Sequence, residues 1–377
     1  MRRLYPYAII ICILVLGLGI WFGRTQLLAW YYVRQLSAAN LENRDPWIAR
    51  ALSLDEAVVP ALIACVDRND DQACDNAMTA LKNLLDRWAS DDPRAISLSC
   101  RIGDAFPAMS AAGQEKVLRL VEGWQKDLKE SGRRALLYAN TGRLLGEAAH
   151  VQDPAVRQQA MTLALESLTA QSADKVPADA GFADACRDLA RGSLADATDA
   201  NRILAIQLAQ WPEINLLAEI VPLLRDRSAA VRRAALLALG PAPEVIGDDH
   251  LFYWLADPDA DVRQLCEMAL RGRGLQESHI RLARLMADRR PAVRLAVIDN
   301  LQVAVDLDAG AWLRRLSHDP VPAIRAAAAR AAVNQARSDL RDRIEQMAQT
   351  DPSPTVQQVA RYYLSCQLLG EKKSLTP

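Results

Sequence analysis

Aromatic residues are scarce in this chain of 377 residues, where Phe, Trp and Tyr together make up 5%. No stretch alternates apolar and polar residues as a half-buried strand does. The charges also nearly cancel, with 45 Lys and Arg against 46 Asp and Glu. A surface that binds phosphate backbones needs a concentrated positive charge, which this balance does not supply. We therefore expect a helical chain and regard nucleic acid as a disfavoured partner.

Groups with catalytic chemistry are few and scattered. The four histidines, His150, His250, His279 and His318, have no second ligand at the spacing of a zinc site. The sequence contains no glycine-rich phosphate loop with its lysine. Ser, His and Asp all occur, but no pattern brings them together as a triad. We predict that the chain is not an enzyme and holds neither a cofactor nor a metal.

The seven cysteines do not form a disulfide pattern. Only Cys65 and Cys74, on consecutive expected helices, are placed so that they could bridge, and the sequence leaves that open. Scattered thiols are typical of a reducing compartment.

A five-fold repeat runs through the C-terminal part of the chain. Each copy has an Asp, five positions later a Val or Ile, and then usually an Arg. The apolar residue recurs at intervals of 31, 31, 31 and 32 residues. A fixed period of this size indicates stacked units that bury each other's apolar faces. The copies are Asp226/Val231/Arg232, Asp257/Val262/Arg263, Asp288/Val293/Arg294, Asp319/Ile324/Arg325 and Asp351/Val356/Gln357.

Each copy reads as a pair of helices. Apolar residues lie three, four, seven and eight positions after the Val or Ile, which makes one stripe on an α-helix. Pro291, Pro322 and Pro354 stand where this helix should begin, a position at which proline is tolerated. A second apolar helix precedes each Asp. The sequence therefore predicts an all-α fold, a right-handed α-solenoid of antiparallel helix pairs.

The copy at Asp257–Arg263, DPDADVR, followed by Ala269 and Leu270, resembles the HEAT-repeat superfamily, in particular the short HEAT-like repeat first named in phycobilin lyases. The resemblance covers Asn215–Leu369. It implies a structural ladder of Asp and Arg side chains between neighbouring turns, from which Gln357 departs. It also leaves two alternative functions open, a bilin lyase-like enzyme and a nucleic-acid-binding solenoid. The ladder residues are Asp226, Arg232, Asp257, Arg263, Asp288, Arg294, Asp319, Arg325 and Asp351.

Near the N-terminus, residues 4–23 form an uncharged run of twenty residues, long enough to span a bilayer. The run ends on bulky residues rather than a small-residue cleavage site, so we expect an uncleaved single-pass anchor. The flanking arginines slightly favour a solenoid on the non-cytoplasmic side. The expected order is a tail at 1–3, the anchor at 4–23, a juxtamembrane helix at 24–40, degenerate helical repeats at 41–213, regular repeats at 214–370 and a tail at 371–377.

Positions two, six and nine after each Val or Ile point away from the core stripe, toward the concave side of a solenoid. This inner row mixes apolar, amide and charged residues of both signs, which suits a protein partner better than a uniform polymer. We predict a membrane-anchored scaffold or adaptor that binds a partner protein on this row and has no catalysis of its own. The inner-row residues are Arg233, Leu237, Gln264, Met268, Arg271, Leu295, Asp299, Gln302, Arg330, Gln358 and Tyr362.

Overall fold

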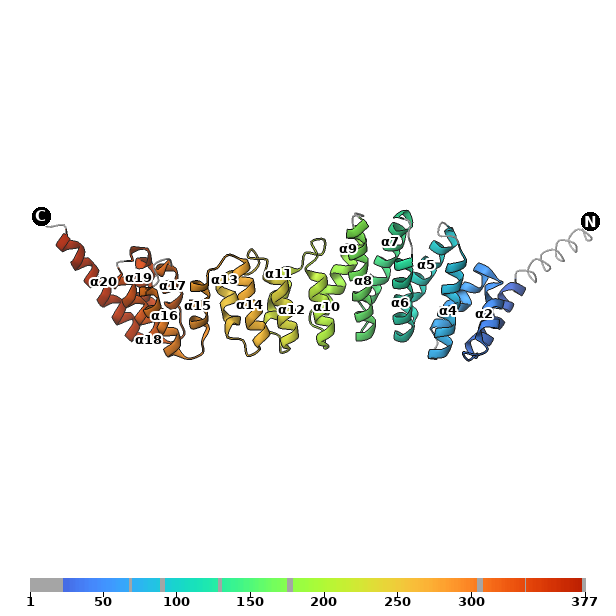
Figure 1. Ribbon diagram of the computed structural model, residues 1–377, viewed down its shortest axis with the longest axis horizontal. Helices are drawn as coiled ribbons and strands as arrows, with labels where there is room; N and C mark the ends of the chain where they lie inside the picture. The colour runs from blue at the N-terminus through green and yellow to red at the C-terminus, as the bar shows by residue number, and fades with distance from the viewer. Residues whose placement is uncertain are drawn as a thin grey trace, which may run out of the picture. The chain divides into compact units, whose positions relative to one another are not determined.

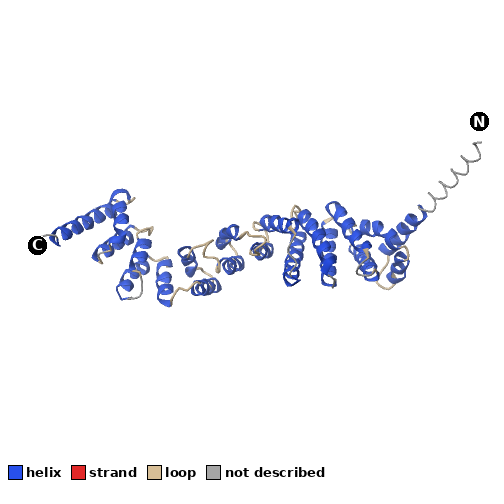
Figure 2. Ribbon diagram, turned by 90° about the horizontal axis from the view of Figure 1, so that it is seen from above, coloured by secondary structure: helices blue, strands red, loops and turns tan. Residues whose placement is uncertain are grey.

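The computed structural model describes residues 23–67, 70–88, 92–127, 131–174, 179–303, 308–335 and 337–374. In these ranges the chain forms helices joined by turns and has no strand (Figure 2). The all-α prediction is confirmed. The chain divides between Leu223 and Leu224 into two compact units. The handedness and the continuity of the helical array stay predictions.

In the first unit the helices pack in chain order (Figure 1). α3 lies against α4, α4 lies against α6, α6 lies against α8, and α7 lies against α9. A helix thus contacts its chain neighbour and the helix two places further on. The helices are 23–37, α2 (Arg44–Leu52), α3 (Val59–Val66), α4 (Asp71–Arg87), α5 (Pro93–Ala105), α6 (Ala111–Asp127), α7 (Ser131–Ala148), α8 (Pro154–Asp174), α9 (Ala180–Ser193), α10 (Asp199–Ala209) and α11 (Leu217–Ile220).

The helix at 23–37 belongs to the packed interior of this unit. Ala29, Val33 and Leu36 are buried along one of its faces. Asn76 of α4 donates through Nδ2 to the backbone oxygens of Leu36 and Ala39, at 2.9 and 2.8 Å. One face of the predicted juxtamembrane helix is therefore covered by protein, whereas Leu27, Trp30 and Tyr31 of the same helix are exposed.

The prediction of a single-pass membrane location is contradicted. Within the described ranges, no helix is both long enough and apolar enough to cross a bilayer. The helix at 23–37 packs one face against protein instead. The expected anchor, 4–23, lies outside the described residues except for Gly23, and so does the tail at 1–3. The prediction that the solenoid lies on the non-cytoplasmic side depends on that anchor, so it is no longer supported.

The second unit alternates the predicted first and second helices of each repeat. α12 packs on α14, α16 on α18, and α18 on α20. Pro291, Pro322 and Pro354 are the first residues of α16, α18 and α20, where the missing N–H has no helical partner to lose. The helices are α12 (Ala229–Leu239), α13 (Asp248–Leu251), α14 (Ala260–Gly272), α15 (Glu277–Ala287), α16 (Pro291–Val303), α17 (Ala309–Leu316), α18 (Pro322–Asn334), α19 (Arg341–Thr350) and α20 (Pro354–Ser374).

The Val or Ile of the predicted core stripe is buried in four of the five copies. Val231, Val262, Ile324 and Val356 are at most 2% exposed. Val293 of α16 is only half-buried. α14 and α16 have little direct contact, unlike the other neighbouring second helices. The step from α14 to α16 is therefore packed more loosely than the steps on either side.

Candidate partner-binding surface

Arg294 of α16 shows how the Asp and Arg side chains link neighbouring turns. Its Nη1 donates to the backbone oxygens of Asp288 and Arg289, both at 3.0 Å, in the turn before its own helix. Its Nε and Nη2 donate to Oδ2 and Oδ1 of Asp319, at 2.7 and 3.0 Å. Both side chains are buried, and the hydrogen bonds to Asp319 raise the pKa of Arg294. One arginine thus closes its own turn and fastens the turn of the next repeat.

The same arrangement occurs at two more steps. Arg232 donates through Nε and Nη2 to Asp257 at 2.9 and 2.8 Å, and Arg325 donates to Asp351 at 2.9 and 2.7 Å. The bonds from Arg325 lower the pKa of Asp351. Asp351 also accepts from the backbone N–H of Ser353 at 2.8 Å, which shapes the turn. Bidentate, charge-assisted hydrogen bonds of this kind are stronger than hydrogen bonds between neutral groups.

The step from Arg263 to Asp288, here called the open step, lacks this pairing. Arg263 Nη1 donates to the backbone oxygens of Asp257 and Pro258 at 2.6 and 3.0 Å, as its counterparts do in their own turns. Asp288, however, accepts from Nε and Nη2 of Arg290 at 3.1 and 2.9 Å. The bonds from Arg290 lower the pKa of Asp288 to about 2. No carboxylate in the described ranges pairs with Arg263.

The first unit contains a related arrangement that the five-fold pattern does not predict. Arg202 Nη1 donates to the backbone oxygen of Asp196, six residues earlier, at 2.8 Å. Arg157 donates through Nε to Asp196 Oδ2 at 2.9 Å. Asn201 stands where the repeat has Val or Ile, and its Nδ2 donates to Asp196 Oδ2 and to the backbone oxygen of Pro154 at 3.1 and 2.9 Å. A search for Asp followed six positions later by Arg, without the apolar residue, would find this copy.

Two further positions keep only part of the arrangement. Gln357 donates through Nε2 to the backbone oxygen of Asp351 at 2.8 Å, which is the bond that Arg makes in the other copies. Arg157 donates through Nη1 to the backbone oxygen of Val151 at 2.7 Å, where the repeat has Asp. The bond to the preceding turn therefore persists when the carboxylate or the guanidinium is replaced.

The inner row lies on the exposed side of the second helices. Leu237, Met268, Leu295 and Tyr362 are 60, 56, 40 and 63% exposed. The side chain of Gln302 lies outside the described residues. The polar members are Gln264, Arg271, Asp299, Arg330 and Gln358, which are exposed, and Arg233, which is half-buried.

The arginines of the inner row differ in their partners. Arg233 forms an ion pair with Asp261 of the next second helix. Arg271 lies 2.9 Å from Glu277, at the start of α15. Arg330 has no ion pair within the described ranges. Arg330 is therefore the inner-row arginine whose charge is least compensated by the chain itself.

A groove of about 560 Å³ crosses α16, α18 and α20. Four inner-row residues line it, namely Leu295, Arg330, Gln358 and Tyr362. The ring of Tyr363 stands edge-on to that of Tyr362, with centroids 5.2 Å apart. Small side chains on α18 keep the groove open between the larger ones. The other lining residues are Ala323, Ala326, Ala327, Val359 and Tyr363.

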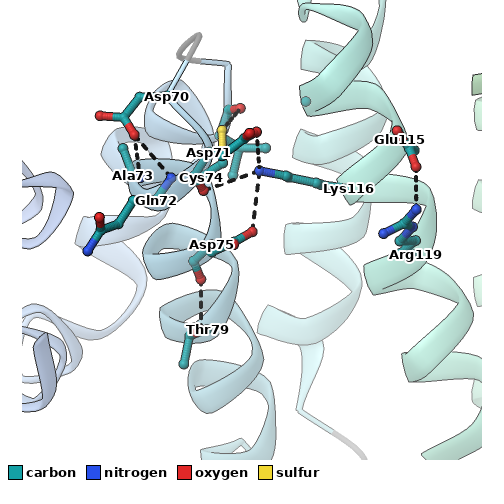
Figure 3. A network of polar contacts seen from close by, with 12 residues as sticks. Asp70, Asp71, Gln72, Ala73, Cys74, Asp75, Thr79, Glu115, Lys116 and Arg119 are labelled. Atoms are coloured by element: carbon teal, nitrogen blue, oxygen red, sulfur yellow. Dashed lines mark hydrogen bonds and ion pairs between the residues drawn. The ribbon is translucent and has the colours of Figure 1, made fainter. Parts of the chain in front are cut away.

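A polar cluster joins α4 and α6 of the first unit (Figure 3). Lys116 Nζ lies 3.2 Å from Asp71 Oδ1 and 3.3 Å from Asp75 Oδ1. Cys74 lies on α4 between these two residues, and its Sγ donates to the backbone oxygen of Val66 at 2.9 Å. Burial raises the pKa of the Cys74 thiol, whereas a cysteine nucleophile must be a thiolate. The cluster therefore has a structural role, which is to link α4 to α6.

Five cysteines of the described ranges are thiols, and four of them are buried, namely Cys65, Cys74, Cys186 and Cys266. Cys65 Sγ lies 3.6 Å from the backbone oxygen of Ala73. Burial raises the pKa of Cys186 and of Cys266 to about 12. The same ranges contain no group of three or more His, Cys, Asp or Glu side chains arranged to hold a metal ion.

No protein-family model matches this chain, and no curated protein is similar to it. The resemblance to HEAT-like repeats therefore rests on the repeat residues themselves. The function has to be inferred from the surfaces that the helices present.

Proposed function

We propose that this chain is a HEAT-like α-solenoid that acts as a scaffold, binds a partner protein on its inner row and has no catalysis of its own. The observation that carries the proposal is the groove across α16, α18 and α20, because Leu295, Arg330, Gln358 and Tyr362 of the inner row line it together. These four residues come from three different repeats.

Three of the four exposed apolar residues of the inner row share one position of the repeat, and the fourth, Leu295, stands at another. Leu237, Met268 and Tyr362 each stand six residues after the Val or Ile of their copy. Single exposed apolar side chains are common on protein surfaces. Large apolar side chains that share one face are typical of interaction sites, because burying them gains about 25 cal/mol for each Å² removed from water. The regular placement thus favours a binding face over chance exposure.

The chemistry of the groove also suits a protein partner. Aromatic residues and arginine are enriched at protein interfaces and often contribute most of the binding energy. Tyr362 offers a broad apolar ring with a polar tip, and Arg330 offers a charge that no carboxylate of the described chain neutralises. Gln358 can donate and accept hydrogen bonds with a peptide backbone. The groove therefore combines an apolar contact with groups that fix orientation.

The test replaces an inner-row residue and an equally exposed apolar residue elsewhere. Tyr362→Asp should weaken partner recovery from native extracts by about tenfold or more, because a carboxylate would be buried in an apolar contact. Leu41 is 72% exposed and lies in a turn of the first unit, so Leu41→Asp should leave recovery unchanged. Quantitative mass spectrometry of the co-purified proteins measures both.

A third variant, Met268→Asp, extends the test to another repeat. All three variants replace exposed residues, and equal thermal unfolding midpoints would show that the fold is kept. If Tyr362→Asp and Met268→Asp both recover the same proteins in the same amounts as the unaltered chain, the inner row is not the binding face.

A further inference from the structure

We propose that Arg263, at the open step, is a binding site for a carboxylate supplied by an acidic segment of another protein. The site is separate from the inner row and does not depend on the function proposed for it. The three paired steps of the same unit, here called closed steps, show what ligand this arrangement takes.

The guanidinium of Arg263 is already held in the orientation that binds a carboxylate. Its Nη1 contacts the backbone oxygens of Asp257 and Pro258 at 2.6 and 3.0 Å. Arg294, at a closed step, makes the equivalent contacts at 3.0 Å each and presents Nε and Nη2 to both oxygens of Asp319. In the described ranges, Nε and Nη2 of Arg263 have no acceptor, and the side chain is half-buried.

The carboxylate that would close the step within the chain is engaged elsewhere. Asp288 Oδ1 accepts from the backbone N–H of Arg290 at 2.8 Å, and both carboxylate oxygens accept from the Arg290 side chain. To reach Arg263, Asp288 would have to give up the bonds to that side chain. The loose packing of α14 on α16 and the half-buried Val293 indicate that the step is also wider than its neighbours.

Further positive charge lies beside this step. A cavity of about 320 Å³ is lined by Arg225 and Arg289, which are exposed and have no ion pair in the described ranges. Two carboxylates line it as well, those of Asp226 and Asp257, and Asp257 is paired with Arg232. The turn that anchors the Arg263 guanidinium forms part of the same wall. An acidic segment would thus approach a surface with uncompensated arginines.

A carboxylate side chain fits this site better than a single hydrogen-bond acceptor does. Arginine binds carboxylates through two parallel N–H···O bonds, and an already anchored guanidinium loses less side-chain freedom on binding. Asp or Glu in a flexible peptide supplies the same group that Asp319 supplies to Arg294. The predicted ligand is therefore a peptide with exposed Asp or Glu side chains.

The test uses the full chain labelled with ¹⁵N-arginine and follows the Nε–Hε signals by NMR. Signals are assigned with Arg263→Lys and Arg294→Lys. On addition of a tetraglutamate peptide, the Arg263 signal should move saturably toward the positions of the Arg232, Arg294 and Arg325 signals. The Arg294 signal should stay in place, because Asp319 already occupies that arginine. A tetraglutamine peptide should move neither signal.

Three outcomes would overturn the proposal. In the first, the Arg263 signal does not respond to tetraglutamate. In the second, it moves no more than the Arg330 signal, which reports the general attraction of anions to exposed arginines. In the third outcome, the Arg263 signal of the peptide-free chain already lies with the signals of the closed steps and shifts in the Asp288→Asn variant. That result would mean that Asp288 closes the step in solution.

Discussion

The two units fasten neighbouring helices with different contacts. In the first unit the contacts differ from step to step: Lys116 reaches Asp71 between α6 and α4, and Ser167 donates to Gln125 at 2.7 Å between α8 and α6. The second unit uses the same Asp–Arg contact at three of its four steps. In both units many helices nevertheless pack on a chain neighbour or on the helix two places further on. A period is visible in the sequence only where the same residue types make the same contact each time.

The largest effect should come from breaking a closed step. Asp351→Ala leaves Arg325 buried without its carboxylate and should lower the free energy of unfolding by about 3–5 kcal/mol. Asp288→Ala at the open step should cost much less, because Asp288 pairs with the exposed Arg290. Urea denaturation followed by circular dichroism measures both. Equal losses would show that the open and closed steps do not differ in solution.

Lowering the pH should destabilise the first unit, because Asp196 becomes protonated. Burial alone would raise the pKa of Asp196, but hydrogen bonds from the Thr198 N–H, Asn201 and Arg157 outweigh it and lower the pKa to about 2. The folded-state pKa is below the unfolded value, so this stabilisation is complete above about pH 4 and disappears as the pH falls toward 2. The loss is on the order of 2 kcal/mol.

Urea midpoints measured between pH 5 and pH 2 test this prediction, with Asp196→Asn as the control that cannot titrate. The unaltered chain should lose more stability across this range than the control. Parallel curves for the two proteins would mean that Asp196 is not a source of the acid sensitivity.

A smaller effect is expected from making the first unit resemble the second. Asn201→Val restores the apolar residue of the repeat, yet it removes the hydrogen bonds to Asp196 and Pro154. We expect a loss of about 1–2 kcal/mol in the free energy of unfolding, because Asp196 and Pro154 would each lose a hydrogen bond from a buried side chain. Increased stability would indicate that the repeat residue is better at this position and that the amide network contributes little.

The smallest effect is expected at Arg263. Arg263→Gln should cost less than about 1 kcal/mol, because Gln357 shows that an amide can make the same bond to the preceding turn. Arg294→Gln should cost several times more, since it leaves the buried Asp319 without its partner. Equal urea midpoints for the two variants would show that the open step stabilises the fold as much as a closed step does.

Much of the second unit could be predicted from the sequence, because each feature has a local cause. Spaced apolar residues predict the stripe, and prolines predict where α16, α18 and α20 begin. The open step could not be predicted, since Arg263 and Asp288 are the same residue types as at the closed steps. Whether Asp288 meets Arg263 or Arg290 depends on the spacing between α14 and α16, which no short motif specifies.

The inner row, too, could be predicted from the sequence only in part. The helical period placed Leu295, Arg330 and Tyr362 on one exposed face, but it could not show that they line one groove, which depends on how closely α16, α18 and α20 pack. The membrane prediction rested on the uncharged run at 4–23 and its flanking residues, and no helix of the described ranges is long and apolar enough to cross a bilayer. The Asp196 copy was missed because Asn201 hides the apolar position of the repeat.

The most direct test of partner binding places a photo-crosslinking amino acid at Tyr362, Met268 or Leu41 of the full chain. Leu41 serves as the control because it is as exposed as Tyr362 and lies in a turn of the first unit. We predict that crosslinkers at Tyr362 and Met268 capture the same protein and that the one at Leu41 does not. Capture of that protein at Leu41 alone, or at none of the three positions, would contradict binding on the inner row.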